Sequence, residues 1–426
     1  MRLSSFKVRG FKNLTQEVVL DELGPVNVLH GPNNVGKSNV LQAMQLFFRL
    51  VRRGGSLVDV PLPDPVPIDD KAWLDLTGMA RTDAFNLEAP VPIRMAAVVE
   101  IDESDLSTAG IESEEPIDRV GVEIELRWMG THVDCQTVGF DWGSRLLARR
   151  PNPTLRQQLA DLLSLSFAFR GKPTDRFALV GVERIASHRA LALRCYDAKE
   201  SDDLAEVRRW ERFVESMGLF EDILGKGQFV ATYDRTSNAA SLLYQTARAR
   251  VPFRLLGSGV QQIAALVGDV LMTNASLAGI EEPELNLRYS MQERLREVFL
   301  QIVGAPGGPS QLFLTSHSPA FESGPTFYFL SPSADGPVAE RRKVEDARVA
   351  VDFPADVAPP EGNAVRCYIS TEGVVRLPSR IMKAVGLPQG GGVMFVEREG
   401  GVEIMSDERF VDELGLDGDG DDAGGG

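Results

Sequence analysis

Apolar and polar residues alternate in several short stretches of this chain, and segments with helical periodicity separate them. Residues 3–9 and 16–29 are predicted to be strands joined by a turn, and the second ends in the apolar run VNVLH. The segment GPNNVGKSN comes next, followed by VLQAMQLFFRLV, which has the spacing of a helix. Residues 53–70 are rich in Gly, Pro and Asp, which predicts a loop.

The pattern of apolar and polar residues changes twice in the middle of the chain. The stretches PIRMAAVVEID and RVGVEIELRW alternate in the manner of antiparallel strands. From about residue 154 to 225 the pattern is helical apart from the strand FALVGVERI. Within it, a charged amphipathic part at about 190–225 is interpreted as a helical insertion, either solvated or a partner-binding arm. A helix (IAALVGDVLM), a strand ending in IEEPE, another helix and the strand QLFLTSHSP complete an α/β pattern.

The last quarter of the chain differs in composition. Residues 351–364 are Pro-rich and predict a linker between a first domain, 1–350, and a small β-rich unit, 365–412. Residues 413–426 are acidic and Gly-rich, so we expect this tail to be disordered. Its DGDGDD run resembles a calcium loop but lacks the downstream glutamate and the flanking helices, which excludes that interpretation.

Composition narrows the class of protein. A hydrophobic content of 43% and a charged content of 25% are ordinary for a globular chain. The net charge of −16 argues against a surface that embraces nucleic acid everywhere, but it leaves room for a local basic stripe. Three cysteines without metal-ligand spacing indicate a reducing compartment. With no signal peptide or membrane span predicted, we expect a cytoplasmic protein without a membrane partner.

One motif carries recognisable chemistry. Residues 31–38, GPNNVGKS, fit the P-loop pattern G-x-x-x-x-G-K-[ST] between an apolar strand and a helix. Their backbone N–H groups predict an anion cradle, with Lys37 reaching the β- and γ-phosphates of ATP and Ser38 binding Mg²⁺. Asn34 stands where glycine is common and tolerates a left-handed backbone. The predicted nucleotide-binding residues are Gly31, Asn33, Asn34, Val35, Gly36, Lys37, Ser38 and Asn39.

Three further motifs follow in a characteristic order. LLGSGVQQ at 255–262 opens a helix, IEEPE ends the next strand, and TSHSP ends a later one. With the P-loop and the opening FKVRGFKNL, this order resembles the ABC-type ATPases, and most of all the RecF/SMC/OLD group associated with DNA. The resemblance covers about residues 1–330. It implies an α/β P-loop head with a mixed sheet, an antiparallel β lobe and a helical insertion.

The resemblance also implies roles for single residues. Two chains would sandwich ATP, with Ser258 and Gly259 of one chain capping the γ-phosphate in the other, although the family usually has its serine at the position of Gly257. The first acid, Glu281, would attend Mg²⁺ directly or through water, since it is longer than the usual aspartate. Glu282 would polarise the attacking water, and His317 would be the switch histidine. The reading of GSG as a plain helix cap remains open.

Some residues near these motifs are harder to assign. Pro283 is expected to end the strand that carries the two acids, and Glu284 to cap the helix that follows. Arg184 or Arg189 would face the nucleotide or form a structural salt bridge. No glutamine between residues 50 and 100 stands out as the Gln-loop residue.

The C-terminal unit has its own resemblance. STEGVVRLPSRIMKAVGLPQGGGVMFVEREGGVEIM is similar to AbrB-like (MazE-like) swapped-hairpin domains, which are generally intertwined dimers and often bind DNA. A dimerisation cap without DNA contact is the open alternative. The chain lacks the clustered acids of a Toprim nuclease, so a nuclease or other effector would be a separate protein.

These resemblances lead to three hypotheses for the function, the third being a scaffold whose ATP site governs assembly while turnover stays negligible. The first is a slow ATPase, a homodimer or higher oligomer, that acts on DNA or serves as the sensor or regulatory subunit of a DNA repair or anti-phage defence system. The second is a nucleotide-gated DNA-binding regulator, or an antitoxin-like protein, that uses the AbrB-like domain.

Overall fold

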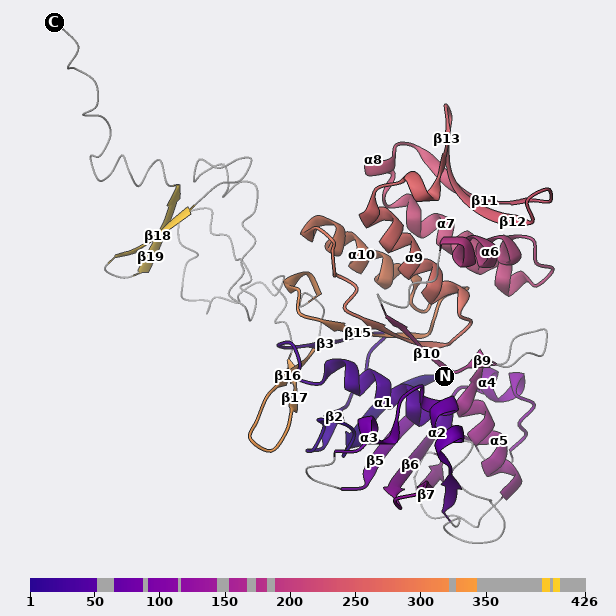
Figure 1. Cartoon of the computed structure of the whole chain (residues 1–426), viewed down its shortest axis with the longest axis vertical. Coiled ribbons are helices and arrows are strands. Elements are labelled where there is room, and N and C mark those ends of the chain that lie inside the picture. The colour runs from indigo at the N-terminus through magenta and orange to yellow at the C-terminus, as the bar shows by residue number, and fades with distance from the viewer. Residues whose placement is uncertain are drawn as a thin grey trace, which may run out of the picture. The chain divides into compact units, whose positions relative to one another are not determined.

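The computed structural model describes residues 1–51, 65–86, 91–113, 116–143, 153–166, 174–181, 188–321, 327–342, 393–398 and 401–406. The chain divides into two compact units, Met1–Val344 and Glu345–Gly426. The first unit contains two six-stranded sheets and the helices that pack on them (Figure 1). In the second unit, the described residues form one hairpin of β18 (Val393–Arg398) and β19 (Gly401–Ser406). The rest of the predicted AbrB-like unit, its linker and its tail lie outside the described residues.

An antiparallel sheet forms one lobe of the first unit, with strand order β2-β1-β5-β6-β7-β4. Its strands are β1 (Arg2–Arg9), β2 (Val18–Leu20), β4 (Val66–Ile68), β5 (Ile93–Glu100), β6 (Arg119–Trp128) and β7 (Val133–Trp142). Every second residue of β5 is buried, as expected for a sheet with one face on the core. The antiparallel lobe predicted from the alternating stretches is therefore confirmed. The predicted loop at 53–70 is wrong for its last residues, which form β4 on the edge of this sheet and the start of α2.

The central sheet has the order β10-β14-β15-β3-β16-β17. Its strands are β3 (Val26–His30), β10 (Phe177–Gly181), β14 (Leu277–Glu281), β15 (Gln311–Ser316), β16 (Phe327–Ser331) and β17 (Val338–Arg342). All are parallel to their neighbours except β17. The single strand predicted at 16–29 is two strands in different sheets. The Asn27 side chain bonds both the N–H and the C=O of Gly24, which fixes a turn between them.

Successive residues of the central strands face opposite sides, and each side has its own core. Leu29, Leu277 and Phe313 pack on α1 (Lys37–Leu50) and on the antiparallel lobe. Val28, Ile280 and Leu314 pack in the core that contains α9 (Ser258–Met272) and α10 (Tyr289–Ile302). Figure 1 shows α1 between the two large sheets and α9 and α10 on the other face of the central sheet. The shorter helices of the antiparallel side are α2 (Asp70–Thr77), α3 (Arg81–Ala84), α4 (Glu103–Thr108) and α5 (Pro153–Ser164).

The helices of the predicted insertion belong to the second core. They are α6 (His188–Lys199), α7 (Leu204–Gly218) and α8 (Glu221–Leu224). Leu191 and Phe213 are fully buried, and a Cβ added at Gly268 of α9 would lie 2.4 Å from Leu191 Cδ1. Both helices bury one face in this core. The solvated insertion and the partner-binding arm both stay predictions for their other faces.

A small antiparallel sheet follows α8 and was not predicted. It consists of β11 (Gly227–Asp234), β12 (Ala239–Thr246) and β13 (Arg250–Pro252), in that order. The short elements that complete the described fold are β8 (Leu165–Ser166), β9 (Thr174–Asp175), η2 (Phe253–Leu255) and η3 (Pro319–Phe321). No helix in the described part of the chain is long and apolar enough to cross a membrane.

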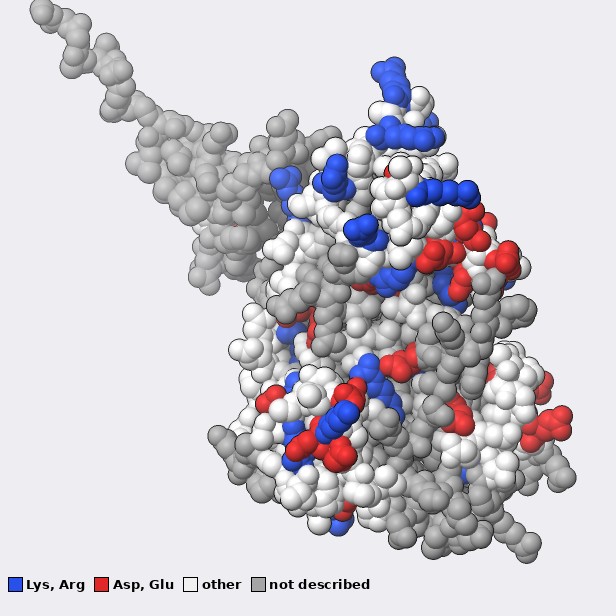
Figure 2. Space-filling view, turned by 45° about the vertical axis from the view of Figure 1, so that its right-hand side comes forward, with Lys and Arg blue, Asp and Glu red and all other residues white. Residues whose placement is uncertain are grey.

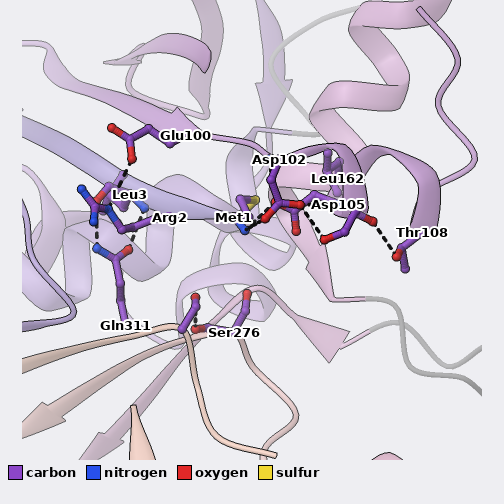
Figure 3. A network of polar contacts seen from close by, with 12 residues as sticks. Met1, Arg2, Leu3, Glu100, Asp102, Asp105, Thr108, Leu162, Ser276 and Gln311 are labelled. Atoms are coloured by element: carbon purple, nitrogen blue, oxygen red, sulfur yellow. Dashed lines mark hydrogen bonds and ion pairs between the residues drawn. The ribbon is translucent and has the colours of Figure 1, made fainter. Parts of the chain in front are cut away.

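One buried side chain ties the two large sheets together (Figure 3). Gln311, at the start of β15, has no exposed surface. Its Oε1 accepts from the N–H of Leu3 in β1 at 2.6 Å, and its Nε2 donates to the carbonyl of Leu3 at 2.9 Å. Nε2 also donates to the carbonyl of Gly24 at 2.9 Å. The same view shows the Met1 amino group paired with Asp105 of α4 at 2.5 Å.

Candidate functional site

The phosphate-binding motif forms the turn between β3 and α1. Gly31, Asn34 and Gly36 have positive φ angles of 144°, 62° and 109°. A Cβ at Gly31 would lie 2.3 Å from the carbonyl oxygen of Leu330, so only glycine fits there. The left-handed backbone expected at Asn34 is confirmed. The loop therefore delivers its N–H groups to the start of α1, where no acidic residue of the first turn opposes an anion.

Lys37 is the first residue of α1 and is 4% exposed. Its Nζ donates to the carbonyl oxygens of Gly31 at 2.8 Å and Pro32 at 3.0 Å. These carbonyl oxygens hydrogen-bond the buried ammonium and hold it at the loop, where the motif predicts phosphate oxygens. Val35 is buried and helps to anchor the loop, whereas Asn33 and Asn34 are exposed.

The segment after β1 braces this loop from outside. Asn13 donates from Nδ2 to the carbonyl of Asn34 at 3.3 Å, and its Oδ1 accepts from Asn39 Nδ2 at 2.8 Å. A Cβ at Gly36 would lie 2.8 Å from Asn13 Oδ1. The side chain of Asn39, predicted to bind nucleotide, is thus engaged with Asn13. The bracing role of Asn13 was not predicted, because the contact joins segments far apart in the pattern of strands.

Glu281 ends β14, beside β15 and close to α1. Gln42 donates from Nε2 to Glu281 Oε1 at 3.4 Å. The Oε1 of Gln42 in turn accepts from Lys12 Nζ at 2.5 Å. Burial lowers the pKa of Lys12, while Asp83 and Glu281 oppose that shift. Gln42 was missed by the sequence interpretation, although its position gives a signal. It follows Ser38 by four residues and so shares a face of the helix with the predicted metal ligand.

Glu282 leaves the sheet by a turn of its own. Its φ is 43°, and its N–H bonds the carbonyl and the hydroxyl of Thr315, both at 3.1 Å. A left-handed glutamate just before a proline is strained, and such strain costs about 1–3 kcal/mol and gathers at functional sites. Pro283 was expected to end the strand that carries both acids. The strand β14 ends at Glu281, so the turn begins one residue before Pro283.

Glu284 does not cap the following helix as predicted. It is 3% exposed, and its Oε1 accepts from Ser316 Oγ at 2.7 Å and from the N–H of His317 at 2.8 Å. The N-cap residue of α10 is Arg288, and no side chain caps the helix there. Glu284 instead binds the end of β15. His317 Nδ1 lies 3.5 Å from the same oxygen, and its side chain is 38% exposed. Glu284 is therefore part of the site, beside the predicted switch histidine.

The LGSG segment, residues 256–259, lies at the N-terminus of α9. Gly257 is the N-cap residue of α9 and Ser258 is exposed, so the interpretation of GSG as a plain helix cap stays open. Gly259 lies over Leu287 and Met291, 3.6 Å and 3.7 Å from where its Cβ would be. Gln262 donates to the carbonyl of Leu285 at 2.5 Å. The segment is thus attached to the turn that follows the two acids.

The structure brings the P-loop, the two acids and His317 to one edge of the central sheet. β3, β14 and β15 are parallel neighbours, and these residues follow or end them. Arg184 lies outside the described residues, and Arg189 is exposed at the start of α6. Among the described residues, no group of three or more His, Cys, Asp or Glu could hold a metal ion. The donor set fits Mg²⁺ bound with a nucleotide, which takes few protein ligands because phosphate oxygens and water supply the rest.

Comparison with known proteins identifies the class. Residues 26–321 match the family model described as "AAA domain, putative AbiEii toxin, Type IV TA system". The match covers more than half of the chain, so the protein belongs to this AAA domain family. No curated protein matches the chain.

Solved structures of SMC heads are similar in fold. A crystal structure of an SMC head bound to the C-winged helix domain of ScpA gives a TM-score of 0.50 at 14% identity, covering 81% of this chain and 99% of that chain. The SMC head domain from Thermotoga maritima gives 0.47 at 15% identity, covering 81% and 100%. An SMC head with an extended coiled coil, bound to the C-terminal domain of ScpA and derived from Pyrococcus furiosus, gives 0.46 at 12%, covering 81% and 97%. The chain has the P-loop ATPase fold of such heads.

Proposed function

We propose that this protein is a slow ATPase that dimerises around Mg–ATP and uses the dimer as a switch. One observation carries the proposal: Lys37 and Ser38, Glu281 and Glu282, and His317 follow or end three neighbouring parallel strands of one sheet. Open parallel sheets bind ligands at the carboxyl ends of their strands. The family match and the fold support the same assignment.

Each residue has a defined part in the proposed reaction. The P-loop N–H groups and Lys37 bind the phosphates, and Ser38 and Glu281 would hold Mg²⁺, which neutralises charge on the β- and γ-phosphates. Glu282 accepts a proton from the attacking water. The oxygen of that water bonds to the γ-phosphorus, and the bond from the γ-phosphorus to the oxygen that bridges it to the β-phosphate breaks, which gives ADP and phosphate. His317 contacts the γ-phosphate or that water.

The surface around the LGSG segment supports a second copy of the chain as the partner. Leu255, 68% exposed, precedes α9. Leu285, 37% exposed, lies in the turn bound to Gln262, and Tyr289, 41% exposed, begins α10 after that turn. Exposed apolar side chains grouped in this way are typical of a protein interface. In the proposed dimer, Ser258 and Gly259 complete the partner's nucleotide site, because a helix N-terminus favours phosphate.

The catalytic assignment can be tested with two variants. Glu282→Gln keeps the shape of the side chain but cannot accept the proton. We expect its ATP affinity to stay near that of the wild type and its turnover to fall by about 100-fold or more. Lys37→Ala should lose most ATP binding. Calorimetric titration with Mg–ATP and a phosphate-release assay measure both. Wild-type turnover in Glu282→Gln would overturn the assignment of the base.

A basic surface supports DNA as the second partner, despite the acidic chain. Residues 225–257 contain five basic residues and one acidic residue. The five basic side chains are all exposed: Lys226, Arg235, Arg248, Arg250 and Arg254. Figure 2 shows Lys and Arg gathered at the end of the first unit that β11–β13 form. This basic surface lies directly before the LGSG segment in the chain, so ATP-driven dimerisation would hold two copies of it in one assembly.

Neutralising the basic surface tests the DNA proposal. The triple change Arg248→Gln, Arg250→Gln and Arg254→Gln should weaken binding to duplex DNA. It should also reduce the slope of log affinity against log salt by about 2–3, because each lost phosphate contact contributes about 0.9. Fluorescence anisotropy across a salt series measures both quantities.

Two comparisons make that test specific. Lys7→Gln, Arg9→Gln and Arg119→Gln remove three exposed cations from the antiparallel lobe and should change little. Deleting residues 365–426 tests the AbrB-like alternative. If the deletion abolishes DNA binding while the first triple change does not, DNA is bound by the C-terminal unit and the regulator hypothesis replaces this one. With DNA as the partner, the protein would act as the sensor or regulatory subunit of a repair or anti-phage defence system with a separate effector.

A further inference from the structure

The carboxylate of Glu284 is buried at the end of β15, beside His317. Its side chain is 3% exposed, and Oε1 takes both hydrogen bonds, from Ser316 Oγ and from the N–H of His317. Oε2 is buried without a hydrogen-bond partner among the described residues, and so is His317 Nδ1. A buried polar group without a partner costs about 1–3 kcal/mol, so a carboxylate kept there calls for an explanation.

The carboxylate contacts of Glu284 lie at His317 and its neighbour Ser316. The oxygen that holds the N–H of His317 also lies 3.5 Å from its Nδ1, so the backbone and one ring edge face the same atom. Ser316 Oγ, held by Glu284, accepts in turn from the N–H of Ser318 at 3.0 Å. The residues on both sides of His317 are therefore fixed through one carboxylate.

Glu284 belongs to the turn that carries the proposed base. The N–H of Leu285 bonds the carbonyl of Glu282 at 3.2 Å, and the N–H of Leu287 bonds that of Glu284 at 3.0 Å. Through this turn, Glu284 joins the end of β14 to the end of β15. A rigid link between these two strand ends fixes the positions of Glu282 and His317 relative to each other.

We propose that Glu284 is a positioning residue that sets the orientation of His317 toward the reacting phosphate, an inference that rests on the proposed ATPase function. The carboxylate accepts from the hydroxyl of Ser316 and from the N–H of His317 through Oε1, and the same oxygen faces Nδ1 of the ring. Loss of this support leaves ATP binding intact and slows the chemical step, because an error of about 1 Å in a reacting group can cost about 100-fold in rate.

Three variants test the proposal. Glu284→Met removes both acceptors at similar volume, and its kcat should fall by about tenfold or more with the KM for ATP unchanged. Glu284→Gln keeps an oxygen for Ser316 and His317 and should retain most of the wild-type kcat. Glu125→Gln is the matched control, since Glu125 is 2% exposed and paired with Arg94 and Arg127 far along the chain from the motifs. The control should lower Tm but leave kcat unchanged.

A double-mutant cycle separates positioning from general damage. In a His317→Ala background, Glu284→Met should have no further effect on kcat, because the group it positions is gone. The proposal is overturned if Glu284→Met lowers kcat by the same factor with and without His317, or if it leaves kcat unchanged.

An NMR measurement that needs no ATP turnover tests the contact between Glu284 and His317 independently of the ATPase assignment. In protein labelled with ¹³C at the histidine ε1 position, His317→Ala identifies the His317 resonance, and Glu284→Met should shift that resonance more than those of the other histidines. An unmoved His317 resonance contradicts the proposal. Absence of wild-type turnover would instead contradict the proposed function, while the resonance still tests the contact.

Discussion

At the scale of residues, three glutamates within four positions have three different surroundings. Glu281 lies beside Gln42 at the end of β14, Glu282 stands on a left-handed turn, and Glu284 is buried against His317. Motif order predicted the first two assignments, which remain proposals. The surroundings of Glu284 and Gln42 could not be read from the sequence, because their partners are set by tertiary packing. The left-handed backbone at Asn34 could be predicted, because a local backbone conformation depends mainly on the residue and its neighbours in the chain.

At the scale of elements, the sequence predicted strands and helices with strong periodicity and missed weaker ones. The parallel strands around the site and the helices α1 and α9 have long apolar patterns and were predicted. The sheet β11–β13 was missed because its strands are rich in polar residues and half-buried. The packing of α6 and α7 was missed because amphipathicity shows that a face is buried but not what covers it.

The contact between the two large sheets gives a prediction about stability. Gln311→Leu removes the hydrogen bonds to Leu3 and Gly24 across 308 and 287 residues of chain. Because buried backbone groups lose their partners, we expect the free energy of unfolding to fall by about 2–3 kcal/mol. Urea unfolding followed by circular dichroism measures the change.

An exposed glutamine supplies the control for that measurement. Gln228→Leu on β11 replaces an exposed side chain, and it should change stability by less than about 0.5 kcal/mol. If Gln311→Leu is as stable as this control, the side chain does not hold the sheets together, and the link between the lobes lies elsewhere.

At the scale of the whole molecule, the first unit has the architecture that a nucleotide-driven dimer needs. Its two cores fix α1 on one face of the central sheet and α9 on the other. The P-loop and the LGSG segment start these two helices. The proposed function requires a site built from the P-loop of one chain and the LGSG segment of another, and this arrangement is compatible with it. The fold class was predictable because four motifs occur in order, whereas the homodimer expected from the same motifs remains a proposal.

The most direct test of the account is the mass of Glu282→Gln in solution with Mg–ATP, measured by light scattering. Blocked hydrolysis should trap the ATP-bound dimer, so the mass should double with ATP and return to that of one chain with ADP. Adding Gly259→Asp should abolish the doubling, since the position has room for a side chain and the new charge would face phosphate in the partner. A mass that does not respond to ATP, while ATP is bound, would contradict the proposed switch.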